Sequence, residues 1–78
     1  MKKIIISQKW KRNGEWSYLI HESEADAKDA LKFWKKHSMY STIVVDKFTV
    51  LEANKILEEH GIDESEFLTN DDLVEVSE

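Results

Sequence analysis

Apolar and polar residues alternate along two β-rich runs near the start of the chain, on either side of Asn13-Gly14. An Asn-Gly pair readily takes the left-handed backbone conformations that tight turns need, so residues 3–21 predict a β-hairpin. A two-residue loop at Asn13-Gly14 would pair Lys11 with Trp16 and scatter the large side chains over both faces. A three-residue loop over residues 12–14, with the glycine left-handed in a G1 bulge, pairs Trp10 with Trp16 instead.

The bulged register separates the two faces of the hairpin more cleanly. The large apolar side chains then share one face: Ile4, Ile6, Trp10, Trp16, Tyr18 and Ile20. The opposite face is mostly polar: Lys3, Ile5, Ser7, Lys9, Lys11, Ser17, Leu19 and His21. Because a slip by one residue exchanges the two faces, the cleaner partition favours the bulged turn.

A helical period replaces the alternation after the hairpin. Ser23 is a suitable N-cap for a helix over roughly 24–38, with acidic residues in its first turn and basic residues in its last, which suits the helix dipole. At 100° per residue, the core-facing side carries Ala27, Ala30, Leu31 and Trp34. The opposite side carries Lys28, Lys32, Lys35 and Lys36, so we expect it to be solvated.

The next segment reads as a strand followed by a second helix. The uninterrupted apolar run at 43–45 favours a strand over 41–48 that is buried on both faces or central in the sheet. Thr49 and Glu52 have the spacing of a capping box, which opens a helix over 50–60.

Gly61 is suited to end this second helix as a left-handed C′ residue. Residues 63–66 predict one short turn that carries Phe67-Leu68 inward. A further turn over 69–72 then leads to a short last strand over 73–76.

The element order β-β-α-β-α-β predicts a small α+β domain spanning residues 1–78. We expect an antiparallel sheet that contains the N-terminal hairpin and the 41–48 strand, with both helices packed on one face. The expected core is Ile4, Ile6, Trp10, Trp16, Tyr18, Ile20, Ala27, Ala30, Leu31, Trp34, Ile43, Val45, Ala53, Ile56, Leu57 and Phe67. A chain this short buries only roughly 60% of its unfolded surface, which leaves little room for a deep pocket.

The amino-acid composition limits which kinds of site and which cellular locations we expect. The chain has no cysteine, so we expect neither a disulfide framework nor a thiolate metal site, as in cytoplasmic proteins. Its longest apolar runs have three residues, far short of the roughly 20 that a membrane span needs, and we expect no membrane association. The acidic segment 62–78 is polar enough to predict partial mobility.

Charge is divided by position along the chain. Residues 1–39 hold nine Lys and Arg against five acids, a net of +4. Residues 40–78 hold two Lys against eleven acids, a net of −9, and the halves sum to the net charge of −5. Asymmetry of this kind indicates partner recognition more than fold.

No spacing of catalytic or metal-ligating residues stands out. His21, His37 and His60 are too far apart in sequence for a helical metal pair, and we expect structural roles for all three, with His21 on the outer hairpin face. None of the serines lies in a G-x-S-x-G context, and neither glycine belongs to a phosphate-binding loop. We therefore expect a protein that is not an enzyme and has no cofactor or metal.

The hairpin tip is one candidate binding site. Cations for phosphate alternate there with rings that can stack on unpaired bases: Lys9, Trp10, Lys11, Arg12 and Trp16. The structural alternative is that both tryptophans belong to the core and the lysines only discourage strand aggregation. The acidic pI of about 5.1 argues against general nucleic-acid affinity.

The acidic second half is the other candidate. It concentrates carboxylates that could dock on a basic protein surface, with Glu58, Glu59, Asp63, Glu64, Glu66, Asp71, Asp72 and Glu75 as the predicted contacts. Ordinary solubility is the alternative explanation, because charged runs are most often solvated faces.

These patterns favour a non-enzymatic module that occupies a partner's surface through its acidic face. The hypothetical setting is a phage or mobile-element inhibitor of a host nucleic-acid-handling complex, an anti-CRISPR or similar anti-defence protein. The alternative is a small nucleic-acid-binding protein that uses the hairpin tip. Homodimers formed by opposite charges are a third arrangement, and the sequence does not choose between intermolecular and internal neutralisation.

Overall fold

The elements follow one another in the predicted order. This computed structural model describes residues 1–37 and 39–77, so the predicted helix end at residue 38 and the last residue of the acidic segment lie outside it. Its strands and helices are β1 Lys2–Lys11, β2 Trp16–His21, α1 Glu24–Lys35, β3 Tyr40–Phe48, α2 Val50–Glu59 and β4 Val74–Glu75, with short 3₁₀ turns η1 Glu64–Glu66 and η2 Asn70–Asp72 before β4. The antiparallel sheet has the order β2-β1-β3, and β4 pairs with the first residues of β1. The α+β class is confirmed.

The hairpin has the bulged register. Trp10 lies opposite Trp16, and the pairing continues to Ile6 opposite Ile20. The Gly14 N–H donates to the Lys11 carbonyl at 2.9 Å, and the Lys11 N–H donates to the Glu15 carbonyl at 2.8 Å. Gly14 has a φ of 92°, which only glycine adopts without strain, so the three-residue loop with a G1 bulge is confirmed.

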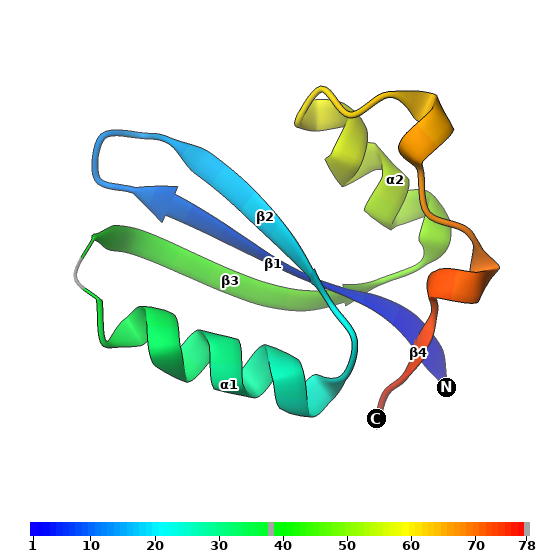
Figure 1. Ribbon diagram of the computed structural model, residues 1–78, viewed down its shortest axis with the longest axis horizontal. Coiled ribbons are helices and arrows are strands. Elements are labelled where there is room, and N and C mark those ends of the chain that lie inside the picture. The colour runs from blue at the N-terminus through cyan, green and yellow to red at the C-terminus, as the bar shows by residue number, and fades with distance from the viewer. Residues whose placement is uncertain (38, 78) are drawn as a thin grey trace.

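The two helices lie on opposite faces of the sheet, so the prediction that both pack on one face was wrong. Ile4 and Ile6 of β1 pack with Ala53 of α2, whereas Ile5 packs with Ala27 of α1. Figure 1 accordingly shows α1 and α2 on either side of the strands. The error came from treating the mostly polar hairpin face, which carries Ile5, as if it needed no helix, whereas both faces of β1 are covered.

The central strand is β1, not the 41–48 segment. β1 pairs with β2, β3 and β4. β3 lies at the edge of the β2-β1-β3 order, and its Val44 is 41% exposed, so the prediction that it is central or buried on both faces was wrong. Of the two aliphatic triplets, 4–6 and 43–45, only the one at 4–6 is buried throughout.

The composition of the core was otherwise predicted well. Every residue of the predicted core is buried or half-buried, and Ile4, Ile6, Ala27, Trp34, Ala53 and Leu57 are fully so. The prediction missed Ile5, Val76, Ser7 and His21, which are also buried. Three of these four residues belong to the hairpin face that the sequence assigned to solvent.

Local signals fix the helix ends. The Ser23 hydroxyl accepts the Asp26 N–H at the start of α1, and Thr49 with Glu52 forms the complete capping box of α2. α1 ends at Lys35, a few residues before the predicted end. Gly61, at φ 80°, ends α2 in a Schellman motif, because its N–H reaches the Glu58 carbonyl and the next N–H reaches the Leu57 carbonyl.

A buried polar chain links the hairpin to α1. His21 is 2% exposed, so its prediction as an outer-face residue was wrong. Its Nδ1 lies 2.8 Å from Asp26 Oδ2 of α1, and its Nε2 lies 2.9 Å from Ser7 Oγ of β1. These bonds satisfy a ring that would otherwise be costly to bury, and they join β1, β2 and α1.

We expect Ser7→Ala to reduce the free energy of unfolding by about 1–3 kcal/mol, because it leaves the buried His21 Nε2 without its partner. Urea unfolding followed by circular dichroism measures this change. Ser17→Ala, at an exposed position on β2, is the matched control and should change stability little. Equal stability of the two variants would contradict the structural role of the network.

Candidate nucleic-acid interface

The two hairpin tryptophans form part of a stack of rings on the α2 side of the sheet. The rings of Trp10 and Trp16 are nearly parallel, at 6°, with centroids 5.6 Å apart. The His60 ring, just after α2, lies 3.7 Å from the Trp16 ring and 4.6 Å from the Tyr18 ring. Trp16 is therefore enclosed between neighbours, whereas Trp10 ends the stack.

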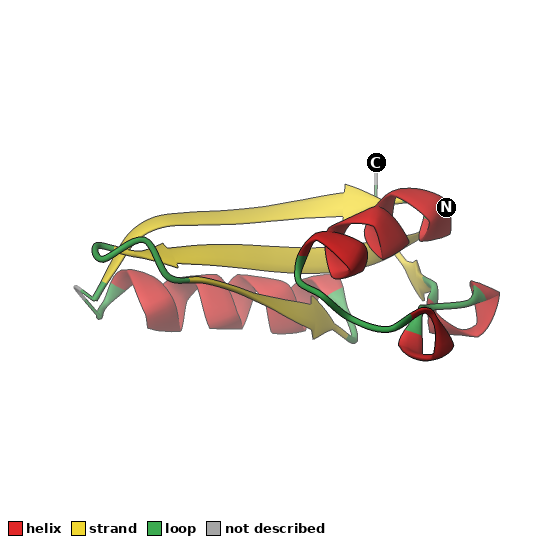
Figure 2. Ribbon diagram, turned by 90° about the horizontal axis from the view of Figure 1, so that it is seen from above, coloured by secondary structure: helices red, strands yellow, loops and turns green. Residues whose placement is uncertain are grey.

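Trp10 borders a shallow hollow on the sheet. This hollow is lined by Trp10, Lys11, Arg12, Gly14, Ser41, Thr42 and Val44. The apolar cluster around Ala53 of α2 includes Tyr18 and Ile20 but stops short of Trp10. Figures 1 and 2 show why, since α2 lies at the end of the sheet away from the hairpin loop. The hairpin end of this face is left uncovered by α2.

Two cations line this hollow, and only one of them has an ion-pair partner among the described residues. Arg12 is exposed at the turn, and Lys11 forms an exposed ion pair with Glu15 at 3.2 Å. Such a pair is worth little in water, so Lys11 can exchange Glu15 for another anion. The structure therefore brings together four of the five predicted tip residues: Trp10, Lys11, Arg12 and Trp16.

Lys9 points to the other face of the sheet. Its Nζ lies 3.8 Å from the ring centroid of Trp34 of α1 and 5.6 Å from that of Tyr40. Burial lowers the pKa of Lys9, because desolvation disfavours its charged form. Among the described residues no carboxylate forms an ion pair with it. Successive residues of a strand point to opposite faces of the sheet, so Lys9 lies on the other face from Trp10. The site predicted from the sequence placed both residues together.

Basic residues of α1 add to the same end of the molecule. The hairpin loop and the C-terminal end of α1 lie together at the left of Figure 1. Lys32 and Lys35 are in the last turn of α1, and Lys36 and His37 follow it, all exposed. The charge asymmetry of the sequence thus becomes a separation in space, with the acidic segment at the opposite end.

The acidic residues do not converge on one site. Three of the eight predicted contacts have internal partners: Asp63 accepts the Ser65 hydroxyl, Asp72 caps η2, and Glu75 pairs with the N-terminal amine at 2.9 Å. That amine lowers the pKa of Glu75. The other five are exposed and make no side-chain hydrogen bond or ion pair with the described residues: Glu58, Glu59, Glu64, Glu66 and Asp71.

The acidic segment is nevertheless attached firmly to α2. The Asn54 side chain accepts the Leu68 N–H at 2.7 Å and donates to the Leu68 carbonyl at 3.0 Å. Leu68 also packs against the cluster around Ala53, and Phe67 is half-buried, so the predicted inward turn is confirmed. The backbone that carries the exposed carboxylates is thereby attached to α2 at Leu68.

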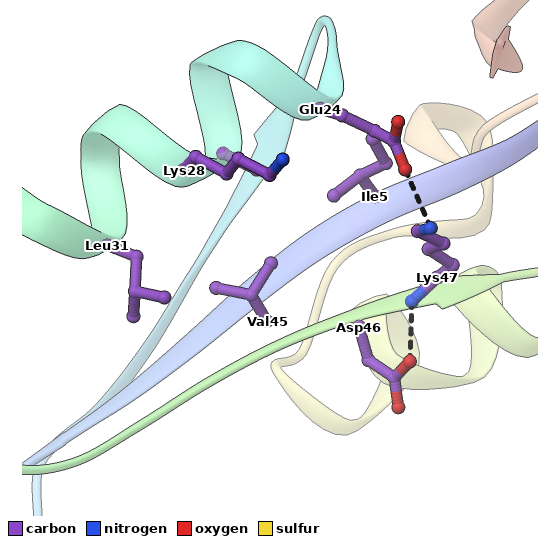
Figure 3. A pocket seen from close by; sticks show the side chains of 8 residues that line it. Ile5, Glu24, Lys28, Leu31, Val45, Asp46 and Lys47 are labelled. Carbon is purple, nitrogen blue, oxygen red and sulfur yellow. Dashed lines mark hydrogen bonds and ion pairs between the residues drawn. The ribbon is translucent and has the colours of Figure 1, made fainter. Parts of the chain in front are cut away.

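A separate hollow, which we call the Glu24–Lys47 hollow, lies between α1 and β3 (Figure 3). Ile5, Leu31 and Val45 form its apolar wall, and an ion pair of Glu24 with Lys47 at 2.6 Å closes one end. Hydrogen bonds from Lys47 and Ser77 lower the pKa of Glu24 to about 2. The volume of the Glu24–Lys47 hollow, about 200 Å³, is below the range of about 300–1,000 Å³ typical of small-molecule sites.

The Ser7-His21-Asp26 chain has the bonding order of a hydrolytic triad. Ser7 is 0% exposed, however, so a substrate carbonyl cannot reach its hydroxyl in this conformation. No group of three or more potential metal ligands occurs among the described residues. In the same part of the chain, no helix is long and apolar enough to cross a membrane.

Comparisons with protein-family models, with curated proteins and with solved structures found no significant match to this chain.

The contact between His60 and Trp16 predicts a pH dependence of stability. Burial lowers the pKa of His60, while the neighbouring Glu59 acts in the opposite direction. The folded state thus favours the neutral ring, and its contribution is complete above the ordinary histidine pKa of about 6.5 and is lost as pH falls below it.

We expect the free energy of unfolding to fall more steeply between about pH 8 and about pH 5 in the wild type than in His60→Gln. Urea unfolding at several pH values tests this, with each protein compared with itself at the highest pH. Parallel curves would show that His60 does not titrate in contact with the ring stack.

Proposed function

We propose that the protein is a non-enzymatic binding module that engages unpaired nucleic acid at its hairpin end. The observation that carries this proposal is the position of Trp10, which ends a stack of rings and borders an open hollow beside Lys11 and Arg12. A base stacked in that hollow would continue the row of rings, and its phosphates would lie within reach of the cations.

Stacking on an aromatic ring tolerates any base, and it needs a base that is not already paired. The Trp10 ring is itself stacked on Trp16, which limits its motion. Trp16 contacts the His60 ring on its other side, and His60 in turn contacts Tyr18, so Trp10 stacks on a ring that already has packing partners. A preorganised ring loses little conformational entropy when a base binds.

The net charge of −5 opposes binding only if the acids lie close to the phosphates. They lie mainly in α2 and the segment after it, and the part of that segment after Gly61 lies at the other end of the molecule from the hairpin loop (Figure 1). Glu58 and Glu59, next to His60, are the acids of α2 nearest the ring stack. Salt screens charges beyond a Debye length of about 10 Å at 0.1 M, so the cations of the loop dominate locally.

We expect Arg12→Glu and Trp10→Leu each to weaken binding to a labelled oligothymidine about fivefold or more, through lost phosphate contact and lost stacking respectively. Fluorescence anisotropy at about 0.1 M salt, where distant charges are screened, gives the dissociation constants. Lys55→Glu, the same charge reversal on α2, is the matched control and should have a small effect. If the wild type has no oligonucleotide affinity even at low salt, this proposal is wrong.

Docking on a basic protein is a second candidate function. It is favoured by the Asn54 clamp, the pair of hydrogen bonds that joins the Asn54 side chain to the backbone of Leu68. A clamped segment presents its carboxylates as a fixed pattern, so binding would not require a mobile tail to become ordered. Such a partner fits the hypothesis of a phage or mobile-element protein that inhibits a nucleic-acid-handling complex. Anti-defence activity and self-association remain hypotheses of the same kind.

Reversal of the carboxylates without internal partners tests the acidic candidate. We expect a variant with Glu64, Glu66 and Asp71 changed to Lys to lose a protein that the wild type captures from its host. Asn54→Ala, which keeps every charge but frees the segment, should weaken capture less. Unchanged capture by the triple variant would remove the acidic surface from consideration.

A further inference from the structure

The Trp10 hollow does not end at the face of the sheet. Ser41 and Thr42 line it, and the same two residues line a second hollow with Trp34, Lys35, His37 and Tyr40. A third hollow shares Trp34, His37 and Tyr40 with the second and adds Phe33 and Met39. The three hollows therefore adjoin one another around the start of β3.

These hollows lie on both sides of the sheet. Trp10 lies opposite Thr42 in the pairing of β1 with β3, on the side that faces α2. Trp34 belongs to α1, which covers the other side. β3 is an edge strand, and the hollows on its two sides adjoin at Ser41 and Thr42, near its start. We call this path the β3-edge groove.

We propose that the β3-edge groove binds one continuous stretch of single-stranded nucleic acid, with a second base-stacking platform on the α1 side. This inference rests on the function proposed above for the Trp10 end. A single strand can turn round the edge of a sheet and expose its bases, whereas in a duplex the bases are paired and stacked within the helix.

The α1 side repeats the chemistry of the Trp10 side. Phe33 is 60% exposed and is held at 4.5 Å from the His37 ring, so it is available as a platform. Exposed Lys35 lines the second hollow, where it can pair with phosphate. Aromatic rings beside cations on both sides of one edge match an alternating chain of bases and phosphates.

Lys9 gives a separate reason to expect an anion here. Its amine is partly desolvated over Trp34, near Tyr40, and has no carboxylate partner among the described residues. Trp34 and Tyr40, the rings nearest this amine, line the second hollow, so a phosphate bound there would lie near a cation that has no carboxylate partner. The phosphates of a single strand thus match the cations of the groove, and its planar bases match the exposed aromatic rings.

The test measures the affinity of the full chain for an oligothymidine of about 12 nucleotides, within the site size of small single-strand binders. We expect Phe33→Ala and Lys35→Glu each to weaken binding about fivefold or more, as Arg12→Glu does on the other side. Lys28→Glu, the same charge change nearer the start of α1, is the control and should weaken binding about twofold or less. Phe33, Lys35 and Lys28 are exposed, so circular dichroism should show all these variants folded.

The outcomes separate the groove from the function on which it rests. If Arg12→Glu weakens binding but Phe33→Ala and Lys35→Glu do not, the Trp10 end binds alone and the groove is wrong. If a duplex of the same length competes as well as the single strand, the groove is also wrong. If the wild type binds no oligothymidine, the function and the groove both fail.

Discussion

The structure depends on the burial of β1 on both faces. Ile4 and Ile6 are committed to α2 and Ile5 to α1, so one strand connects two separate apolar clusters. A chain of this length has too little apolar material to cover both faces along their whole length. α2 covers the Ile4 end of its face, and towards the hairpin end of that face the stacked tryptophan rings are contacted by His60, which follows the helix. The candidate site is the part of the sheet that the helices do not cover.

The same arrangement sorts the charges. Alternation along β1 and the loop sends Lys9 to the α1 side and leaves Arg12 at the turn, so cations flank the start of β3 from both faces. The Schellman end of α2 and the Asn54 clamp direct the acidic segment along the other end of the molecule. A modest net charge therefore conceals two surfaces of opposite sign.

Local signals in the sequence predicted local structure well. The Gly14 bulge, the Ser23 cap, the Thr49–Glu52 capping box and the Gly61 helix end are all present, because each depends on residues a few positions apart. Long-range placement was harder to predict. A three-residue apolar run has the same appearance in a central strand and in an edge strand. The run at 43–45 was therefore predicted to be central, although the central run is 4–6. The two helices were likewise predicted to pack on one face of the sheet, although they cover both. For the same reason the burial of His21 and the contact of His60 with Trp16 were missed, since neither has a signal within its own segment.

The central claim is that unpaired nucleic acid binds at the hairpin end and the start of β3. Chemical-shift mapping by ¹H–¹⁵N NMR during titration with oligothymidine tests it most directly, because backbone amides and indole N–H groups report the contact residue by residue. The account predicts shifts at residues 11–14 and 40–44 and at the Trp10 indole, with little change along the acidic segment. Shifts confined to residues 58–75, or no shifts at low salt, would contradict it.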